Sequence, residues 1–397
     1  MGDLAVRLNG FPTGSANAYA ENPDTQLNTW ADDPRANFAH YGMSYLFFNY
    51  LQGRFGPEII RDVILAPCEG ICGVQASLNK RANGLTFNEA FADWAATNFV
   101  NDATIENGRY AYTNEKDFKI TRETPINRYP SQLPVVMHEY AANYFALDLQ
   151  ARDVTIYFTG TTTARLLPTD AHSGKWVWYS NRADLANMNL TREIDLTRAS
   201  KATLKFWTWY SIEKDFDYAY VEVSTDGGKT WEILPGKNTT TDDPNGSSFG
   251  PAFTGKSGTK DNGTEAQWVQ EEMNLSTYAG KKILLRFEYL TDDAFNTPGF
   301  LVDDIEIPEI NFSDDAEKLE GWTATGFVRV DNVLPQKFIV QVVQVGATTK
   351  ITRMPLDAQN RGNITINNLN NFSKVEVIVT AYAPTTTEPT EYQIGVK

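Results

Sequence analysis

Acidic side chains recur near the ends of candidate strands in the middle of the chain, where they could bind a cation. They are Glu213, Asp215, Asp217, Asp292, Asp293, Asp303 and Asp304. Calcium takes six to eight oxygen ligands, mostly carboxylates and carbonyls, and a cluster drawn from distant segments could supply them. The pattern predicts a calcium site. The alternative is a set of solvated turn carboxylates, which Asp- and Asn-rich loops produce freely.

Carbohydrate chemistry is a weaker interpretation of the same region. Paired carboxylates serve glycoside hydrolysis, but neighbours on one strand point to opposite faces, so Asp303 and Asp304 are not expected to act together. Five aromatic residues could form a sugar-stacking platform: Trp176, Trp178, Trp207, Trp209 and Tyr210. Because they lie inside candidate strands rather than at loop tips, we interpret them as packing residues.

Zinc chemistry would require histidines at a defined spacing. The motif His-Glu-x-x-His puts two imidazoles one helical turn apart, with the Glu polarising a metal-bound water. The chain has three histidines, His40, His138 and His172, and none has a second histidine four residues on. His138-Glu139 begins like the motif, but position 142 is Ala142. We expect no catalytic zinc site and no peptidase activity from this chain alone.

The two cysteines, Cys68 and Cys72, are separated by three residues. A structural zinc site would need two further ligands nearby, and no other Cys or His is close in the sequence. A small-loop disulfide formed in an oxidising compartment is the preferred interpretation. A pair of free thiols is the alternative.

Composition limits the class of protein. The 397 residues carry a formal charge of -15, which argues against binding to a phosphate backbone and fits a soluble acidic surface or cation binding. No run of about 18 apolar residues is present, so no membrane span is expected. Residues 1–30 lack a basic segment followed by an apolar one, so we expect no signal peptide. If the protein is secreted, its N-terminus is missing or it is exported otherwise.

Residues 1–125 have the pattern of a helical subdomain. Phe38, Tyr41, Tyr45 and Phe48 fall at helical spacing, and Leu46, Phe47 and Tyr50 widen the stripe, which predicts a largely buried helix. Thr86 and Glu89 are placed as a capping box before a second apolar stripe.

The remaining sequence favours strands. Two are expected at 140–149 and 154–159 and five at 338–345, 349–354, 362–369, 374–382 and 392–396. Two strands alone are not stable, so we predict one discontinuous β-sandwich of the immunoglobulin/fibronectin-like kind from 126–162 and 326–397. The alternative is three domains in a row, with the first two strands belonging to the middle domain.

Residues 163–325 form the predicted middle domain. Its candidate strands are 175–180, 202–210, 218–224, 230–234, 267–273, 282–290, 299–307 and 321–325, and this number of antiparallel strands predicts a jelly-roll β-sandwich. The turn at Asp226-Gly227-Gly228 has the glycines that a tight hairpin needs. Ser224-x-Asp226-x-Gly228-x-Thr230-Trp231 resembles the Asp-box hairpin, a folding device of many secreted β domains.

Several motifs from Trp176 onward occur in an order that resembles one family. They are Ala-Thr-Leu-x-Phe, Trp-Tyr-x-Ile-Glu, Asp-Tyr-x-Tyr-Val-x-Val-Ser-Thr-Asp-Gly-Gly and Gly-Phe-x-Val-Asp-Asp-Ile. The segment resembles the β domain that follows the catalytic domain in secreted metallopeptidases of the immune inhibitor A type. Residues 1–125 are similar to the helical lower half of a gluzincin metallopeptidase.

This resemblance implies a C-terminal support portion of such an enzyme, secreted, with zinc only in a missing N-terminal half. It also raises the expectation of calcium, with Asp217 and Asp303 at the best-matching positions and Glu213 and Asp304 next. His40 and Tyr41 follow the position of the third zinc ligand, where a His or Tyr can stabilise an oxyanion. We favour helix packing for His40 and a core position for Tyr41.

The partners implied are the missing catalytic half, a protein substrate or a cell-surface glycan, with no nucleic acid. Two alternative functions stay open. One is an extracellular binding module for carbohydrate or a cell surface, and the other is a structural β protein that assembles with itself.

Overall fold

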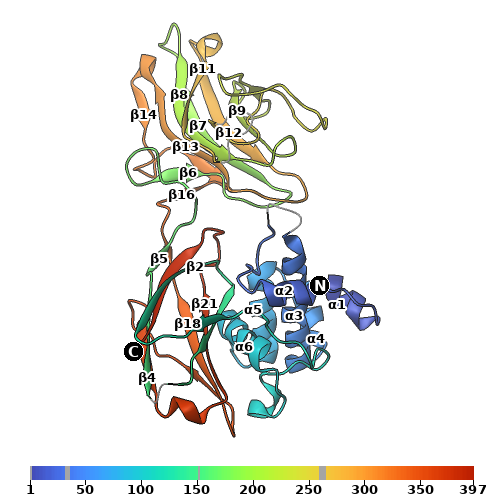
Figure 1. The fold of residues 1–397 in the computed structure, drawn as a ribbon. Coiled ribbons are helices and arrows are strands. Elements are labelled where there is room, and N and C mark those ends of the chain that lie inside the picture. Colours follow the sequence, from blue (N-terminus) through green and yellow to red (C-terminus); the bar gives the residue numbers. More distant parts are fainter. Residues whose placement is uncertain (1, 32–35, 151–152, 259–264) are drawn as a thin grey trace. The chain divides into compact units, whose positions relative to one another are not determined.

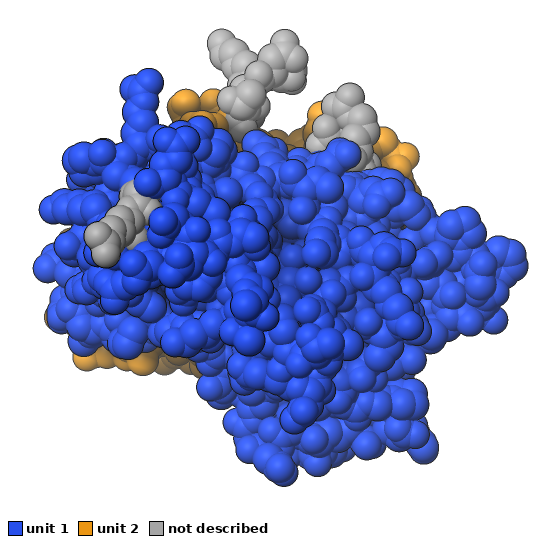
Figure 2. Space-filling model, turned by 60° about the horizontal axis from the view of Figure 1, so that its bottom comes forward, with its two compact units in different colours: residues 1–166, 334–397 blue, residues 167–333 orange. Residues whose placement is uncertain are grey.

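The computed structural model describes residues 2–31, 36–150, 153–258 and 265–397, and these residues are mainly β, with six α-helices. Figure 1 shows the fold. The chain divides into two compact units. Unit 1 comprises residues 1–166 and 334–397, and unit 2 comprises residues 167–333, shown in blue and orange in Figure 2.

The helices lie in the first hundred residues of unit 1. They are α1 (Gly2–Leu8), α2 (Ser15–Glu21), α3 (Asn37–Phe55), α4 (Glu58–Ile64), α5 (Gly70–Arg81) and α6 (Phe87–Val100). Short 3₁₀ turns occur at Ile105–Gly108, Ser276–Tyr278, Pro308–Ile310 and Leu369–Asn371. The predicted capping box is confirmed at the start of α6: Thr86 accepts from the Glu89 amide, and the Glu89 carboxylate accepts from the Thr86 amide.

Helix α3 is largely buried, as predicted, but two residues of the expected stripe lie at the surface. Its innermost side chains are Met43, Leu46, Phe47, Tyr50 and Leu51. Phe38 and Tyr41 lie near the opposite side and are 50% and 49% exposed, so the core position expected for Tyr41 is wrong. The Tyr41 ring packs instead on Trp30, 4.8 Å between centroids. Aromatic residues occur all round this helix, so their spacing alone did not identify the inner face.

Two sheets complete unit 1. The first has the order β1 (Thr124–Ile126), β3 (Ala142–Leu147), β21 (Lys374–Ala381), β18 (Phe338–Val345) and β19 (Lys350–Arg353). The second has the order β2 (Ser131–Met137), β22 (Thr390–Val396), β4 (Val154–Gly160) and β20 (Arg361–Ile366). Strand β4 therefore lies between two strands from the C-terminal segment. A short ladder joins β5 (Thr163–Ala164) to β17 (Leu334–Pro335).

The first sheet is buried on both faces. Val377 and Val379 of β21 pack in the core shared with the second sheet, whereas Ile378 of the same strand packs with the helices. Unit 1 thus has a helical layer and two β layers (Figure 1). Because alternate side chains both meet apolar partners, β21 is rich in apolar residues, although Glu376 and Thr380 are buried in it as well.

Unit 2 has two facing sheets. One has the order β10 (Glu232–Ile233), β9 (Tyr218–Ser224), β12 (Lys282–Leu290), β7 (Asn187–Asp195) and β15 (Thr323–Thr325). The other has the order β11 (Val269–Asn274), β8 (Thr203–Ser211), β13 (Gly299–Ile307), β6 (Val177–Tyr179) and β16 (Val328–Val330), with β14 (Phe312–Asp314) beside β13. Inward-facing residues from both sheets, such as Phe206 and Phe287, form one core.

Three differences from the predicted elements have physical causes. Strands β2 and β7 were not expected. Strand β2 is largely exposed and contains Pro134, and in the polar sequence of β7 only Met188, Leu190 and Ile194 are buried. Residues 326–333 lie in unit 2, because β16 pairs with β6. In the described residues, no helix combines the length and apolar character that a membrane crossing requires.

Candidate metal centre

Two connections meet at one end of the unit 2 sandwich. Residues 212–217 join β8 to β9, and residues 291–298 join β12 to β13. The ladder registers place Leu290 opposite Tyr218 and Gly299 opposite Ser211, so both connections leave the sheets at the same end. This arrangement brings Glu213 and Asp217 of the first connection to Asp292 of the second.

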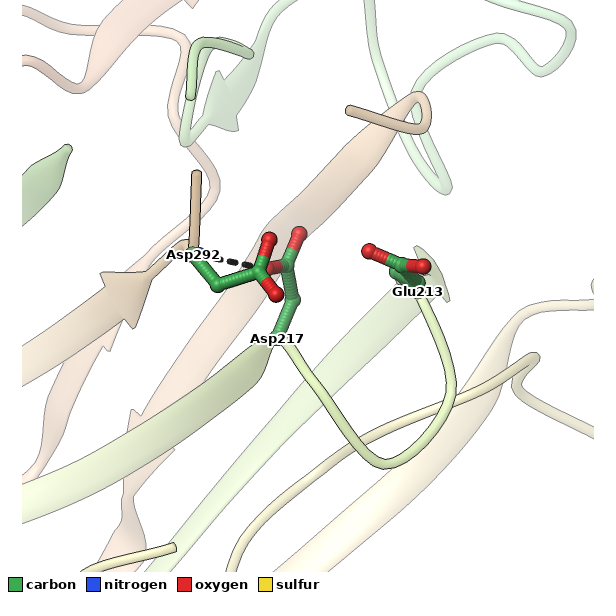
Figure 3. Close-up of side chains that lie close together, drawn as sticks. All are labelled: Glu213, Asp217 and Asp292. Atoms are coloured by element: carbon green, nitrogen blue, oxygen red, sulfur yellow. Dashed lines mark hydrogen bonds between the residues drawn. The ribbon is translucent and has the colours of Figure 1, made fainter. Parts of the chain in front are cut away.

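Carboxylate oxygens of Glu213, Asp217 and Asp292 all lie within 4.8 Å of one another. Figure 3 shows the Glu213 carboxyl group across from the other two, at the base of the connection that leads to Asp217. Among the described residues, these three form the one group of at least three Asp, Glu, His or Cys side chains that lie close enough together to hold a metal ion.

The hydrogen bonds of the cluster are unevenly distributed. Asp217 is buried; its Oδ1 accepts from the Asp292 amide at 2.9 Å and its Oδ2 from the Tyr289 hydroxyl at 3.1 Å. Oε2 of Glu213 is buried and has no hydrogen-bond partner among the described residues. The Glu213 carboxylate therefore has unused acceptor capacity.

Burial and mutual repulsion disfavour the charged forms of these carboxylates. Burial raises the pKa of Glu213 to about 7, with repulsion from Asp292 and Asp217 adding to the effect. Burial likewise raises the pKa of Asp217 to about 6, although its hydrogen bonds from Asp292 and Tyr289 oppose the rise. A divalent cation would remove the repulsion, and oxygen ligands of this kind suit calcium.

Asp303 and Asp304 are not in this cluster. Oδ2 of the buried Asp303 accepts from the amides of His172 and Ser173 at 2.9 and 3.2 Å. Oδ2 of Asp304 lies 2.6 Å from Nδ1 of His172, and its Oδ1 accepts from the Ser173 hydroxyl at 2.7 Å. Both carboxylates therefore hold the turn at His172–Ser173.

The expectation that Asp303 and Asp304 point to opposite faces is wrong. The ladder between β13 and β8 shifts register after Asp303, and Asp304 has a left-handed backbone with φ of 46°. Such a bulge redirects one side chain, and here it brings the second carboxylate to the side of the first.

Asp292 takes the place that Asp303 was expected to fill. It lies two residues after Leu290, the last residue of β12, and its amide donates directly to Asp217. The sequence offers one signal for Asp292, because acidic residues stand at one end of both β9 and β12. Using this signal requires knowing that β12 pairs with β9 and in which register.

The three histidines lie in separate surroundings. His40 is buried in α3, where burial lowers its pKa, and its ring lies 5.9 Å from that of Trp30. Nδ1 of His138 is 3.3 Å from Oδ2 of Asp24. His172 stacks on Trp207 with ring centroids 3.9 Å apart, and Trp178 is buried, as expected of packing residues.

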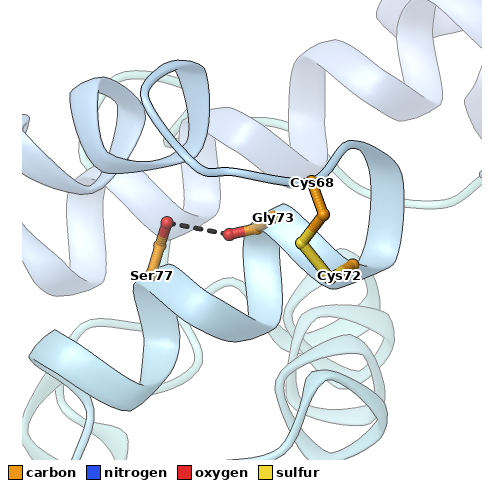
Figure 4. The surroundings of a disulfide bond; sticks show 4 residues. All are labelled: Cys68, Cys72, Gly73 and Ser77. Atoms are coloured by element: carbon orange, nitrogen blue, oxygen red, sulfur yellow. Dashed lines mark hydrogen bonds between the residues drawn. A yellow bond between two sulfur atoms is a disulfide. The ribbon is translucent and has the colours of Figure 1, made fainter.

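Cys68 and Cys72 are joined by a disulfide, with their Cα atoms 5.8 Å apart. Figure 4 shows the bridge at the turn that enters α5, where the Ser77 hydroxyl donates to the Gly73 carbonyl in the following turn. The bridge closes the start of this helix.

The hairpin after β9 is held by Asp226. Its Oδ1 accepts from the amides of Lys229 and Thr230, each at 3.0 Å, and its Oδ2 accepts from the Thr230 hydroxyl at 2.7 Å. These bonds hold the pKa of Asp226 down to about 2. The aspartate thus acts on the local backbone of the turn.

Comparison with known proteins places the central segment. Residues 152–332 match the family described as the immune inhibitor A-like MAM domain. Over 160 residues the chain is 35% identical to the pre-pro-metalloprotease PrtV of Vibrio cholerae serotype O1, covering 39% of this chain and 16% of that protein. Immune inhibitor A of Bacillus thuringiensis subsp. alesti is 32% identical over 162 residues, or 39% of this chain and 21% of that protein.

A third relative is bacillopeptidase F of Bacillus subtilis strain 168, which is 30% identical over 147 residues, 36% of this chain and 9% of that protein. The matched segment thus spans about a fifth or less of the length of each of these relatives. The resemblance to the immune inhibitor A type is confirmed by these matches.

Proposed function

We propose that this chain, whose residues 152–332 are similar to the immune inhibitor A-like MAM domain, is an accessory portion of a secreted metallopeptidase. The similarity of that segment to a metalloprotease and to immune inhibitor A supports the proposal. In this function the chain supports the enzyme, and a His-Glu-x-x-His segment on another part of the protein supplies the zinc and the activated water.

The architecture of each part accords with this role. We infer that unit 2, with its two facing sheets, is a jelly-roll sandwich, that the two sheets of unit 1 form an immunoglobulin/fibronectin-like sandwich, and that the helices correspond to the lower half of a gluzincin domain. The Cys68–Cys72 disulfide supports an extracellular location, since such bonds persist in oxidising compartments. The catalytic half is the expected partner of the helical layer.

Calcium is the proposed cofactor, held by Glu213, Asp217 and Asp292. The short separation of these carboxylates and the unused acceptor of Glu213 support it. Calcium there would fix the connections at 212–217 and 291–298, so its role is structural. Asp303 and Asp304 contribute to the fold of the neighbouring turn and not to this site.

One experiment tests the accessory function directly. Sequencing the transcript upstream of the Met1 codon is expected to reveal an in-frame His-Glu-x-x-His, and its absence would contradict the proposal. In parallel, the chain alone should contain no stoichiometric zinc and should not hydrolyse a general protein substrate. Turnover that a zinc chelator blocks, and that is lost in His40→Ala, would contradict the assignment of the chemistry to another segment.

A further inference from the structure

Three polar side chains in the helical layer of unit 1 each keep an atom that lacks a hydrogen bond. Tyr19 belongs to α2, and Trp94 and Asn98 belong to α6. All three residues are fully buried. The Tyr19 hydroxyl, Trp94 Nε1 and Asn98 Nδ2 have no hydrogen-bond partner in the part of the chain that the structure describes. We call these three residues the α2–α6 polar cluster. Buried polar atoms in native proteins are nearly always bonded, so three open atoms need an explanation.

Contacts between the side chains show that the open atoms lie close together. Trp94 and Asn98 are four residues apart, which places them on the same side of α6. The Tyr19 ring stacks on the Trp94 ring with centroids 5.4 Å apart. Burial raises the pKa of Tyr19 well above its usual range, and the Asn98 side chain acts on the same hydroxyl in the opposite direction. The cluster is therefore one site, although its members do not bond to one another directly.

Two further tyrosines border the cluster and use their hydroxyl protons elsewhere. The Tyr112 hydroxyl donates to Asn98 Oδ1, and the Tyr144 hydroxyl donates to the Ala95 carbonyl at 2.9 Å. Both tyrosines are buried, and their oxygens can still accept a hydrogen bond. Exchanging the nitrogen and oxygen of the Asn98 amide would again leave one of its polar atoms open. The shortage of partners therefore does not depend on that assignment.

The chemistry of the open atoms decides which ligand they suit. Trp94 Nε1 and the Asn98 amide nitrogen can only donate, whereas the Tyr19 hydroxyl can donate or accept. A metal cation cannot accept from the two nitrogens. An anion would bring a charge to a fully buried site whose side chains include no base, at a much higher cost than a neutral molecule. Water both accepts and donates, so one molecule can satisfy all three atoms.

We propose that the α2–α6 polar cluster binds one buried water molecule. It accepts hydrogen bonds from Trp94 Nε1 and Asn98 Nδ2 and donates one to the Tyr19 hydroxyl oxygen, and Tyr112 or Tyr144 can accept its second proton. Buried waters typically make about three hydrogen bonds to groups that otherwise lack partners. This water is a structural ligand that joins α2 to α6 inside the aromatic core of unit 1.

The direct test is a crystal structure of the full chain at a resolution that shows ordered water. One water peak is expected within hydrogen-bond distance of Trp94 Nε1, Asn98 Nδ2 and the Tyr19 hydroxyl. Direct bonds among these atoms with no peak between them would overturn the proposal. A peak that refines as a halide or another anion would overturn it as well.

Tyr19→Phe tests the proposal in solution through the sign of its effect. If the hydroxyl is bonded to water, its removal costs a hydrogen bond, and the melting temperature of unit 1 should fall by about 2–4 °C. If the hydroxyl has no partner, its removal relieves an unsatisfied buried group, and the melting temperature should rise. A rise would therefore contradict the proposed water.

Tyr392→Phe is the matched control. Tyr392 is a buried tyrosine in the other core of unit 1, and its hydroxyl accepts directly from Asn143 Nδ2 at 3.1 Å. Its melting temperature should fall by a similar amount, which calibrates the loss of one bonded hydroxyl. The crystal structure of the parent decides the proposal even where a variant fails to fold.

Discussion

Arg109 binds both carboxylate oxygens of Asp93, through hydrogen bonds of 2.9 Å from Nε to Oδ2 and from Nη2 to Oδ1. Asp93 lies in α6 and is fully buried. Arg54 of α3 and Arg353 of β19 bind the same carboxylate at 2.7 and 3.0 Å. One aspartate therefore joins two helices, a loop and the edge of a sheet within unit 1.

Replacing the Asp93 carboxylate should greatly lower the free energy of unfolding. Asp93→Asn leaves three guanidinium groups around a neutral side chain, and breaking a buried pair costs about 3–5 kcal/mol. Glu106→Gln is the matched control, since Glu106 pairs with the same Arg109 at 2.9 Å but at the surface; the loss there should be below about 1 kcal/mol. Urea unfolding measures both, and equal losses would contradict this account.

Glu376 of β21 should make the free energy of unfolding depend on pH. It is fully buried, and neither carboxyl oxygen has a hydrogen-bond partner among the described residues. Burial raises its pKa to about 9, with repulsion from Glu123 adding to the effect and Lys374 opposing it. The folded pKa lies above the unfolded value, so this contribution to stability is full below about pH 4.3 and is lost as pH rises through about 9.

Glu376→Gln should therefore flatten the pH dependence of the unfolding free energy. The parent is expected to lose on the order of 4 kcal/mol more than the variant between about pH 5 and pH 8. Glu391→Gln, an exposed glutamate on β22, is the control and should follow the parent. Parallel curves for the parent and Glu376→Gln would refute the prediction.

Calcium should stabilise unit 2 by mass action. At a concentration about 100 times the dissociation constant, the gain is about 2.7 kcal/mol, which corresponds to roughly 5–10 °C in Tm. Asp217→Asn and Asp292→Asn should each remove most of this response. Asp293→Asn changes the same charge one residue away and should keep it. Differential scanning calorimetry in calcium and in chelator measures the effect. Identical curves for the parent in the two conditions would contradict the proposed calcium site.

The disulfide should make a modest contribution. Closing so short a loop stabilises by about 2 kcal/mol in the chain-entropy model, so Cys68→Ser with Cys72→Ser should lower the stability of unit 1 by about that amount. A reductant should shift the unfolding curve of the parent to the same position and leave the double variant unchanged. A reductant effect on the double variant would show another cause.

Unit 2 should fold when it is expressed alone. The side chain of Asn332 bonds to the backbone of Leu167 in both directions, at 2.7 and 3.2 Å, so the two ends of the unit lie together. Residues 167–333 should unfold in one cooperative transition.

Deleting 334–397 removes both neighbours of β4, and trypsin should then cut between 131 and 160 rapidly. Continued protection of that segment would be the contrary result.

Part of the fold could be predicted from the sequence, and the rest required knowledge of which strands pair. Strands β9, β12 and β13 were predicted at 218–224, 282–290 and 299–307, because their apolar runs are bounded by turn residues. Strand β7 was missed, since it lies between β12 and β15 in its sheet but exposes a polar face. A sequence reports which residues prefer burial, but a strand with three buried residues among asparagines and acids resembles a loop.

The candidate metal site likewise combines residues that the sequence identified with one that strand pairing was needed to identify. Glu213 and Asp217 were identified from acids at strand ends, but their partner depends on which strand follows β9 in the sheet. Asp303 was preferred to Asp292 because its motif matched a family, and the bulge that turns Asp304 toward His172 leaves no mark in composition. Periodicity likewise showed that α3 is buried but not which of its aromatic sides faces inward.

The interrupted sheet of unit 1 constrains the order of events on the ribosome. Strand β4 ends at Gly160, and its neighbours β20 and β22 begin at Arg361 and Thr390. At about 5–20 residues per second, β4 emerges roughly 10–40 s before β20. Unit 2 is completed within that interval, while the strands of unit 1 still expose unpaired edges that invite aggregation. A nascent chain of this kind is therefore a natural client for a chaperone that binds extended apolar segments.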